Sequence, residues 1–174
     1  MRPKLLYLLN LLTILFASGG YDNGTSAGKG RWDISLTLNP FNYFNHGQSY
    51  AVIGYGVTEK FDIHMYYSKA QQGNDNYYGG LFYQFYQSKK LNLSTAIGVR
   101  KYTNEKTTHL FVPQLLYTLQ LNEKVSVGGS FVEIRNQSLI NKLGMSHDLF
   151  FTFKLFESEK YRVDFSAGAF NPAL

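Results

Sequence analysis

The chain contains no cysteine, and only 17% of its 174 residues carry a charge. The lack of cysteine excludes a disulfide framework and any metal site built on thiolates, but it says nothing against an oxidising compartment, where disulfides are optional. After the N-terminal segment, no window places apolar residues at the i, i+3, i+4 and i+7 spacing of an amphipathic helix with capping residues. Helices are therefore not expected in the body of the protein.

One apolar run stands apart from the rest of the sequence. Residues 5–17 are almost all apolar, they follow Arg2 and Lys4, and they lead into the small residues 17–20. This order is typical of a secretory signal peptide, and the run is short for a membrane anchor, which needs roughly 20 apolar residues. We predict a signal peptide over residues 1–20, a flexible leader rich in Gly, Ser and Asn over 21–30, and one domain over 31–174.

The charge balance is mild, and the aromatic content is high. Without Arg2 and Lys4 the chain has 15 basic and 12 acidic residues, and no basic run interleaves with aromatic residues, so nucleic acid is not an expected partner. The 14 tyrosines and 14 phenylalanines accompany a slightly negative mean hydropathy. This combination fits a protein that meets lipid on one face and water on the other.

Four short segments repeat one pattern of small polar residue, charge, lysine and apolar residue. Each lies between two runs of alternating hydrophobicity, which indicates a tight β-hairpin turn. Short turns on one side and longer loops on the other are typical of a transmembrane β-barrel. The four segments are Thr58-Glu59-Lys60-Phe61, Ser88-Lys89-Lys90-Leu91, Asn122-Glu123-Lys124-Val125 and Ser158-Glu159-Lys160-Tyr161.

Alternating apolar and polar residues predict nine strands. Pro113 falls inside the sixth, where it cannot donate a ladder hydrogen bond, so we expect a bulge there. The predicted strands are 31–39, 50–57, 61–68, 77–87, 91–100, 109–121, 125–131, 148–155 and 161–169, and the longer loops are 40–49, 69–76, 103–108 and 136–146. Bacterial barrels with both termini in the periplasm have an even strand number. We therefore favour a ten-strand design whose last strand is missing or rudimentary, with eight strands as the alternative.

Alternation alone does not say which face is wet, because soluble sheets and membrane barrels share it. Here the polar faces carry mostly Ser, Thr, Asn, Gln, Gly, Ala and Tyr, which suit a narrow packed interior, while Lys and Glu gather in turns and loops. Several aromatic residues fall near strand ends on the apolar face, as interfacial girdles require. They are Trp32, Tyr67, Tyr77, Tyr83, Tyr117 and Tyr161.

The polar faces also contain a few ionisable residues of both signs. Buried charges are tolerated only when they are paired. We predict an interior network in which Arg100, Lys154 and Arg162 neutralise the aspartates, and the alternative places these charges in water at the rims. The residues are Asp33, Asp62, His64, Arg100, Asp148, Lys154, Arg162 and Asp164.

The segment Tyr55–Ile63 resembles a hairpin that recurs in bacterial outer-membrane β-barrel proteins: tyrosine-glycine, threonine, acid, base, apolar, acid. Weaker copies occur at the other three turns. The resemblance implies an all-β, antiparallel up-and-down transmembrane β-barrel of eight to ten strands in the bacterial outer membrane. It also implies outer-membrane lipid and the barrel-assembly machinery as partners. The chain departs from this family at its end, because such proteins generally finish on an aromatic residue and this one finishes on Leu174.

Catalytic chemistry has only weak candidates. They are His46 with Ser49 in one loop, and Ser146-His147-Asp148 before the eighth strand. Adjacency is poor evidence for a catalytic triad, because neighbouring strand residues point to opposite faces. No HxH or HxxxH spacing and no GxGxxG motif before a helix occurs, so neither a metal nor a cofactor is expected.

These observations favour a small outer-membrane barrel with a structural or adhesive role, or with minor solute passage. A lumen of eight to ten strands is largely filled by side chains, so a wide pore is not expected. The first alternative is a soluble secreted or periplasmic barrel that binds an apolar ligand, as lipocalins do. The second is a hydrolase or acyltransferase at the outer rim of a membrane barrel.

Overall fold

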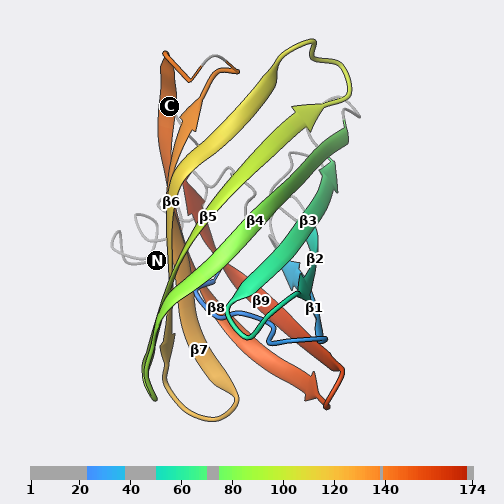
Figure 1. Ribbon diagram of the computed structural model, residues 1–174, viewed down its shortest axis with the longest axis vertical. Helices are drawn as coiled ribbons and strands as arrows, with labels where there is room; N and C mark the ends of the chain where they lie inside the picture. Colours follow the sequence, from blue (N-terminus) through green and yellow to red (C-terminus); the bar gives the residue numbers. More distant parts are fainter. Residues whose placement is uncertain (1–22, 38–49, 70–74, 138, 172–174) are drawn as a thin grey trace, which may run out of the picture.

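The computed structural model describes residues 23–37, 50–69, 75–137 and 139–171, and within them the protein is a closed all-β barrel (Figure 1). The predicted loop 40–49, with His46 and Ser49, therefore lies outside the described residues. No helix able to span a membrane is found in the described part of the chain. The strands are β1 (Trp32–Thr37), β2 (Tyr50–Gly56), β3 (Phe61–Lys69), β4 (Asp75–Gln87), β5 (Leu91–Tyr102), β6 (Thr108–Gln120), β7 (Val125–Arg135), β8 (Lys142–Glu157) and β9 (Tyr161–Asn171).

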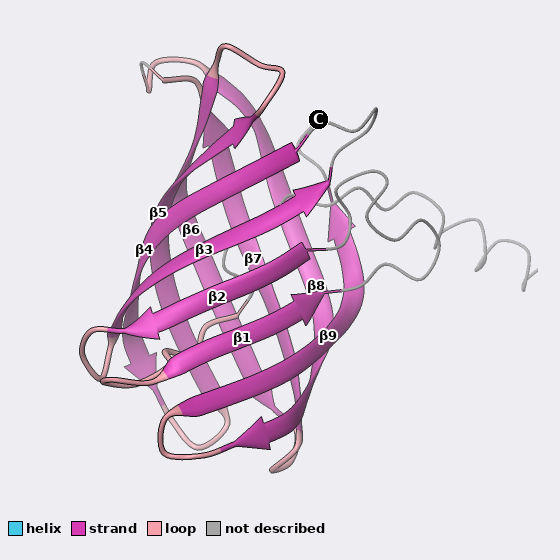
Figure 2. Ribbon diagram, turned by 90° about the vertical axis from the view of Figure 1, so that its right-hand side faces the viewer, coloured by secondary structure: helices cyan, strands magenta, loops and turns pink. Residues whose placement is uncertain are grey.

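Nine strands close the barrel through one parallel pair. Each strand is antiparallel to the next along the chain, and β9 pairs in parallel with β1, with Trp32 opposite Tyr161 (Figure 2). Eight reversals leave the ninth strand running in the same direction as the first, so the closing pair must be parallel. Both edges of β1 are occupied, by β2 and β9, so the barrel formed by the described residues has no open edge for a tenth strand. The ten-strand and eight-strand designs are therefore wrong, and β9 ends at the opposite end of the barrel from the start of β1.

The four repeated segments form the turns at one end of the barrel, and their chemistry explains the repeat. In each turn the side-chain oxygen of the first residue accepts hydrogen bonds from the backbone amides of the third and fourth. Asn122 Oδ1 accepts from Lys124 and Val125, both at 2.9 Å, and Ser88 Oγ accepts from Lys90 at 3.3 Å and Leu91 at 2.9 Å. Thr58 and Ser158 do the same. A short polar side chain is therefore needed at this position.

Strand β4 has aromatic residues on both faces, so its own sequence does not show which face points inward. Its pairing with β3 and β5 fixes the orientation. Tyr78 and Phe82 are buried in the lumen, whereas Leu81 is 46% exposed on the outer face. Glycines on the inner wall make room for the Tyr78 ring, because a Cβ at Gly98 would lie 1.9 Å from its hydroxyl oxygen. Packing of an aromatic ring over an inward-facing glycine is a known device of curved sheets.

The bulge expected at Pro113 is confirmed. The pairing of β6 with β7 shifts register between Phe111 and Gln114, and its pairing with β5 shifts between Ala96 and Gly98. Proline supplies no amide for the ladder, so one unpaired residue is accommodated at this point.

An aromatic layer crosses the middle of the lumen. Tyr66 and Tyr78 are stacked with their ring centroids 5.0 Å apart, and Phe111 meets Tyr78 edge-on at 5.5 Å. Phe82 and Phe150 are at most 1% exposed and belong to the same buried cluster. The core of this barrel is therefore inside the lumen, while the outer faces of the strands carry exposed apolar side chains.

Candidate functional site

The leader segment, residues 23–30, enters the lumen at the tight-turn end of the barrel (Figure 1, blue). Gly24 donates its amide to Thr118 Oγ1 at 2.8 Å and accepts from Ser94 Oγ at 2.6 Å. The Ser26 amide donates to Gln84 Oε1 at 2.7 Å, and the Ala27 amide donates to Asp62 Oδ2 at 2.8 Å. These partners come from β3, β4, β5 and β6, so the leader segment ties several strands together.

Two glycines allow the leader segment to lie against the barrel wall. A Cβ at Gly24 would be 2.6 Å from the carbonyl oxygen of Asn92, and one at Gly56 would be 1.8 Å from the carbonyl oxygen of Gly28. Backbone therefore meets backbone at both places, and a larger residue does not fit. Composition indicated a flexible leader, whereas residues 23–30 are held by side chains from strands distant in the sequence.

A polar cavity of about 170 Å³ lies beside the leader segment, and we call it the turn-end chamber. Its neutral lining consists of Asn23, Thr25, Thr118, Gln120, Ser126 and Thr152. Its charged lining consists of Lys124, Lys154, Glu157, Arg162 and Asp164. None of the described residues that line the chamber is apolar, so it can hold water or a polar ligand.

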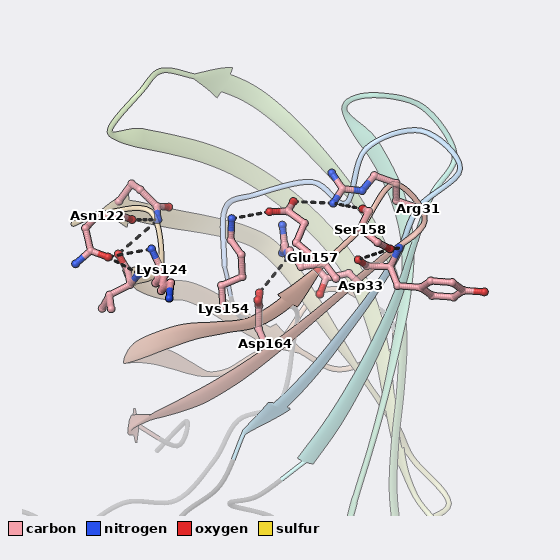
Figure 3. Close-up of polar contacts among 12 residues, drawn as sticks. Arg31, Asp33, Asn122, Lys124, Lys154, Glu157, Ser158 and Asp164 are labelled. Carbon is pink, nitrogen blue, oxygen red and sulfur yellow. Dashed lines mark hydrogen bonds and ion pairs between the residues drawn. The ribbon is translucent and has the colours of Figure 1, made fainter.

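Glu157 is held between two cations at the mouth of this chamber (Figure 3). Lys154 Nζ lies 2.6 Å from one carboxylate oxygen, and the Arg31 guanidinium lies 2.6 Å from the other. The hydrogen bonds from Lys154 and then from Arg31 lower the pKa of Glu157 from 4.5 to about 2, because they stabilise its charged form. Arg31 precedes β1 and Glu157 ends β8, so this ion triad spans the seam at which the barrel closes.

A second ion triad lies deeper in the same end. Arg162 contacts Asp33 on the neighbouring β1, and its Nε lies 3.1 Å from Asp164 Oδ2 on its own strand. The three side chains are only 11%, 4% and 6% exposed. Because each carboxylate is paired, these buried charges are compatible with a stable barrel.

The other ionisable residues singled out in the sequence make separate contacts. Asp148 accepts a hydrogen bond from Ser130 Oγ at 3.0 Å, and His64 lies 3.2 Å from the hydroxyl of Tyr78. The guanidinium of Arg100 lies 3.3 Å from His109 Nδ1 and 4.6 Å from the centre of the Phe111 ring. Arg162 thus neutralises aspartates as expected, whereas Lys154 pairs with Glu157, and Arg100 contacts a histidine and aromatic rings.

Sequence reasoning missed three charged residues of this site, Arg31, Lys124 and Glu157, as well as its neutral lining. All three lie next to turns or at strand ends, where a charged residue is normally interpreted as exposed to solvent. Arg31 and Glu157 are 126 positions apart in the sequence and meet only because β1 pairs with β9. A prediction that β1 pairs in parallel with β9 would have brought these residues together. The alternation of polar and apolar residues within single strands does not predict that pairing.

The catalytic candidates are not brought together in the described residues. The side chain of His147 is exposed on the outer face of β8, where it stacks on Phe131 with centroids 4.5 Å apart. Asp148 is 1% exposed and faces the lumen. Of Ser146 only the backbone, within β8, is described. The described residues contain no cluster of three or more possible metal ligands of the His, Cys, Asp or Glu type.

Comparison with known proteins gives no relative from which a function could be carried over. No protein-family model, no curated protein and no solved structure matches this chain. The residues of the barrel and their geometry therefore carry the functional conclusion.

Proposed function

We propose that this chain is a membrane-spanning barrel of the bacterial outer membrane, with a structural or adhesive role rather than solute passage. The observation that carries the proposal is that the outer face of the barrel is apolar. Every strand presents large apolar side chains outward, and Leu81, Ile97 and Phe151 near the middle of their strands are 46%, 49% and 50% exposed. The inward positions hold Asp, Ser, Thr, Asn and Gln together with the aromatic layer, and many of the polar side chains are less than 5% exposed. Lipid is the solvent that suits such an outer face.

Aromatic residues on the outer face support the same proposal. At the tight-turn end, Trp32 and Tyr55 have ring centroids 4.9 Å apart, and Tyr161 is the partner of Trp32 across the seam. Toward the loop end, Tyr67 and Tyr77 have ring centroids 5.4 Å apart. Two aromatic groups separated along the strands match the girdles of membrane barrels, whose rings prefer the two interfaces.

The contents of the lumen argue against solute passage. The stacked rings of Tyr66 and Tyr78 and the buried Phe82 fill the middle, and the leader segment occupies the tight-turn end. Barrels of about eight strands have interiors just wide enough for side chains. We therefore place the function in the outer surface and the loops.

The two alternatives find less support. A soluble barrel that binds an apolar ligand needs a polar outside and an open apolar interior, whereas here the outside is apolar and aromatic rings fill the middle of the lumen. A rim hydrolase needs a histidine oriented by an acid, but His147 and Asp148 point to opposite faces of β8. Loss of lipid hydrolysis in a His147→Ala variant is the result that the hydrolase would require.

The proposal is tested by expressing the chain in a Gram-negative host and separating its membranes. We expect the protein in the outer-membrane fraction, resistant to carbonate extraction, and with an electrophoretic mobility that changes on heating because the folded barrel resists detergent. A protein that stays in solution without detergent after cell lysis would overturn the proposal. Leu81→Lys with Leu149→Lys is a matched variant, since two charges on the lipid face should reduce the folded fraction.

A further inference from the structure

We propose that the turn-end chamber is a binding site for a small organic anion of about the size of a three-carbon phosphate or acid. The proposal concerns the lumen and goes beyond the membrane assignment. It requires only the polar chamber beside the leader segment, so it holds whether the outer face meets lipid or water.

The charges of the chamber do not balance. Glu157 is shared between Lys154 and Arg31, and Arg162 is shared between Asp33 and Asp164, so the two triads carry opposite net charges and cancel. Lys124 is the remaining charged residue of the lining, and in the described part of the chain it has no ion-pair partner. The surplus positive charge at the chamber favours an anion.

The position of Lys124 distinguishes it from the lysines of the other turns. Lys60, Lys90 and Lys160 hold the same place in the repeat, but only Lys124 lines the chamber among the described residues. Its turn places it at the end of the barrel where Lys154 also lines the cavity. Lys154 uses one of its three N–H donors on Glu157, which leaves donors for a ligand.

The size and neutral lining define the rest of the ligand. About 170 Å³ is far more than one water needs, and it is close to the roughly 150 Å³ that admits a ring of six carbons. The hydroxyls of Thr118, Ser126 and Thr152 line the wall together with the amide of Gln120. Such groups both donate and accept hydrogen bonds, so they suit a ligand that carries hydroxyl groups next to its anionic group.

The test is isothermal titration calorimetry of the detergent-solubilised full chain with glycerol 3-phosphate, glycerate, inorganic phosphate and uncharged glycerol. We expect saturable binding of glycerol 3-phosphate or glycerate, weaker binding of inorganic phosphate and none of glycerol. Lys124→Ala should weaken binding about tenfold or more, because a hydrogen bond to a charged group is lost. Lys90→Ala, at the same place in another turn, should leave the affinity unchanged.

A second variant tests the chamber itself. Ser126→Leu fills the space without changing the charge, and we expect it to abolish binding while the far-ultraviolet circular dichroism of the folded β-barrel persists. The proposal is overturned if glycerol binds as well as the anions, if inorganic phosphate alone binds, or if Lys124→Ala and Lys90→Ala weaken binding equally. Equal weakening by the two substitutions would mean that the anion is attracted by the overall positive charge of the turns and not by Lys124 in the chamber. Failure of membrane insertion would leave these results interpretable, because the chamber does not require lipid.

Discussion

At the scale of single residues, this barrel is defined by which face each side chain occupies. Neighbouring residues in β4 have opposite surroundings: Leu81 meets the outside, and Phe82 is fully buried in the lumen. The same holds for glycines, because Gly79 faces outward into open space while Gly98 faces the ring of Tyr78. The effect of a substitution should therefore depend on whether its side chain points into the lumen or to the outer face.

A lysine on the outer face should be costly in the middle of a strand and tolerated near its end. Leu81→Lys is expected to lower the free energy of unfolding in lipid vesicles by about 2–4 kcal/mol, and Tyr86→Lys near the turn by about 0–1 kcal/mol. Urea-induced unfolding followed by tryptophan fluorescence of Trp32 measures both values. Equal costs at the two positions would argue against a hydrocarbon core around the barrel.

Two glycine substitutions form a matched pair. Gly98→Ala places a Cβ 1.9 Å from the Tyr78 hydroxyl oxygen, and this ring is held by its stacking on Tyr66 and by the hydrogen bond from Gln114. We expect a loss of about 1–3 kcal/mol in the free energy of unfolding. Gly79→Ala meets no atom within 4 Å and should be neutral or stabilising by up to about 1 kcal/mol. Chemical denaturation of the two variants in parallel gives the comparison, and a harmless Gly98→Ala would contradict the described packing.

At the scale of elements, the four tight turns use one local device. A short polar side chain at the first position accepts two amide hydrogen bonds and closes the hairpin. This local chemistry made the turns visible in the sequence. The longer connections at the other end share no such sequence motif.

The turn device predicts which substitutions a hairpin tolerates. Asn122→Ala removes the acceptor of two amide hydrogen bonds and should lower the free energy of unfolding by about 1–2 kcal/mol. Asn122→Ser should retain most of the stability, because serine fills this position at residues 88 and 158. Refolding yield into detergent micelles and urea midpoints provide the measurement. A serine variant as unstable as the alanine variant would show that the hydroxyl is no substitute in this turn.

At the scale of the whole molecule, closure joins the two ends of the sequence. β1 pairs with β9, Arg31 meets Glu157, and Arg162 meets Asp33. The leader segment then crosses the inside of the same end and bonds to residues of β3 to β6. The tight-turn end is therefore the part of the molecule in which distant segments are most strongly coupled.

The ion triad at the seam predicts a pH dependence of stability. The pKa of Glu157 is lowered to about 2 in the folded barrel, so its ion pairs stabilise the fold above the ordinary value of 4.5. That contribution should decrease as the pH falls from about 4.5 to about 2, because the unfolded chain takes up the proton first. Glu157 is partly exposed, so solvent screening keeps the effect modest. Glu157→Gln should flatten this part of the profile in thermal unfolding between pH 2 and 6, and an unchanged profile would exclude the linkage.

Because the lumen is filled, the barrel is expected not to conduct ions. Purified protein reconstituted in planar lipid bilayers should give no steady conductance, because the aromatic layer and the leader segment leave no continuous water path. A large porin reconstituted in the same bilayers is the positive control. Reproducible conductance steps from the folded barrel would contradict the structural or adhesive role and would favour solute passage.

Much of the architecture could be predicted because it is local. Alternation with a period of two predicted the nine strands, and the short polar residue two positions before each lysine marked the four turns. In β4 the alternation left the orientation open, because aromatic residues occur on both faces and the two faces differ little in polarity. The bulge at Pro113 could also be predicted, because proline lacks a backbone N–H in any context.

The closure and the chamber could be decided only in three dimensions. An even strand number was favoured because bacterial barrels with both termini in the periplasm have one. The barrel instead closes where the edges of β1 and β9 meet, and that contact depends on the tilt and register of all nine strands. Arg31, Glu157 and the leader segment acquire partners only after closure, through contacts as much as 126 residues apart in the sequence. The amino-acid sequence by itself determined the strands, the turns and, outside β4, the polarity of most strand faces, because these follow from neighbouring residues. The tertiary structure decided which charges meet and where a polar chamber forms, because both arise from strands brought together by closure.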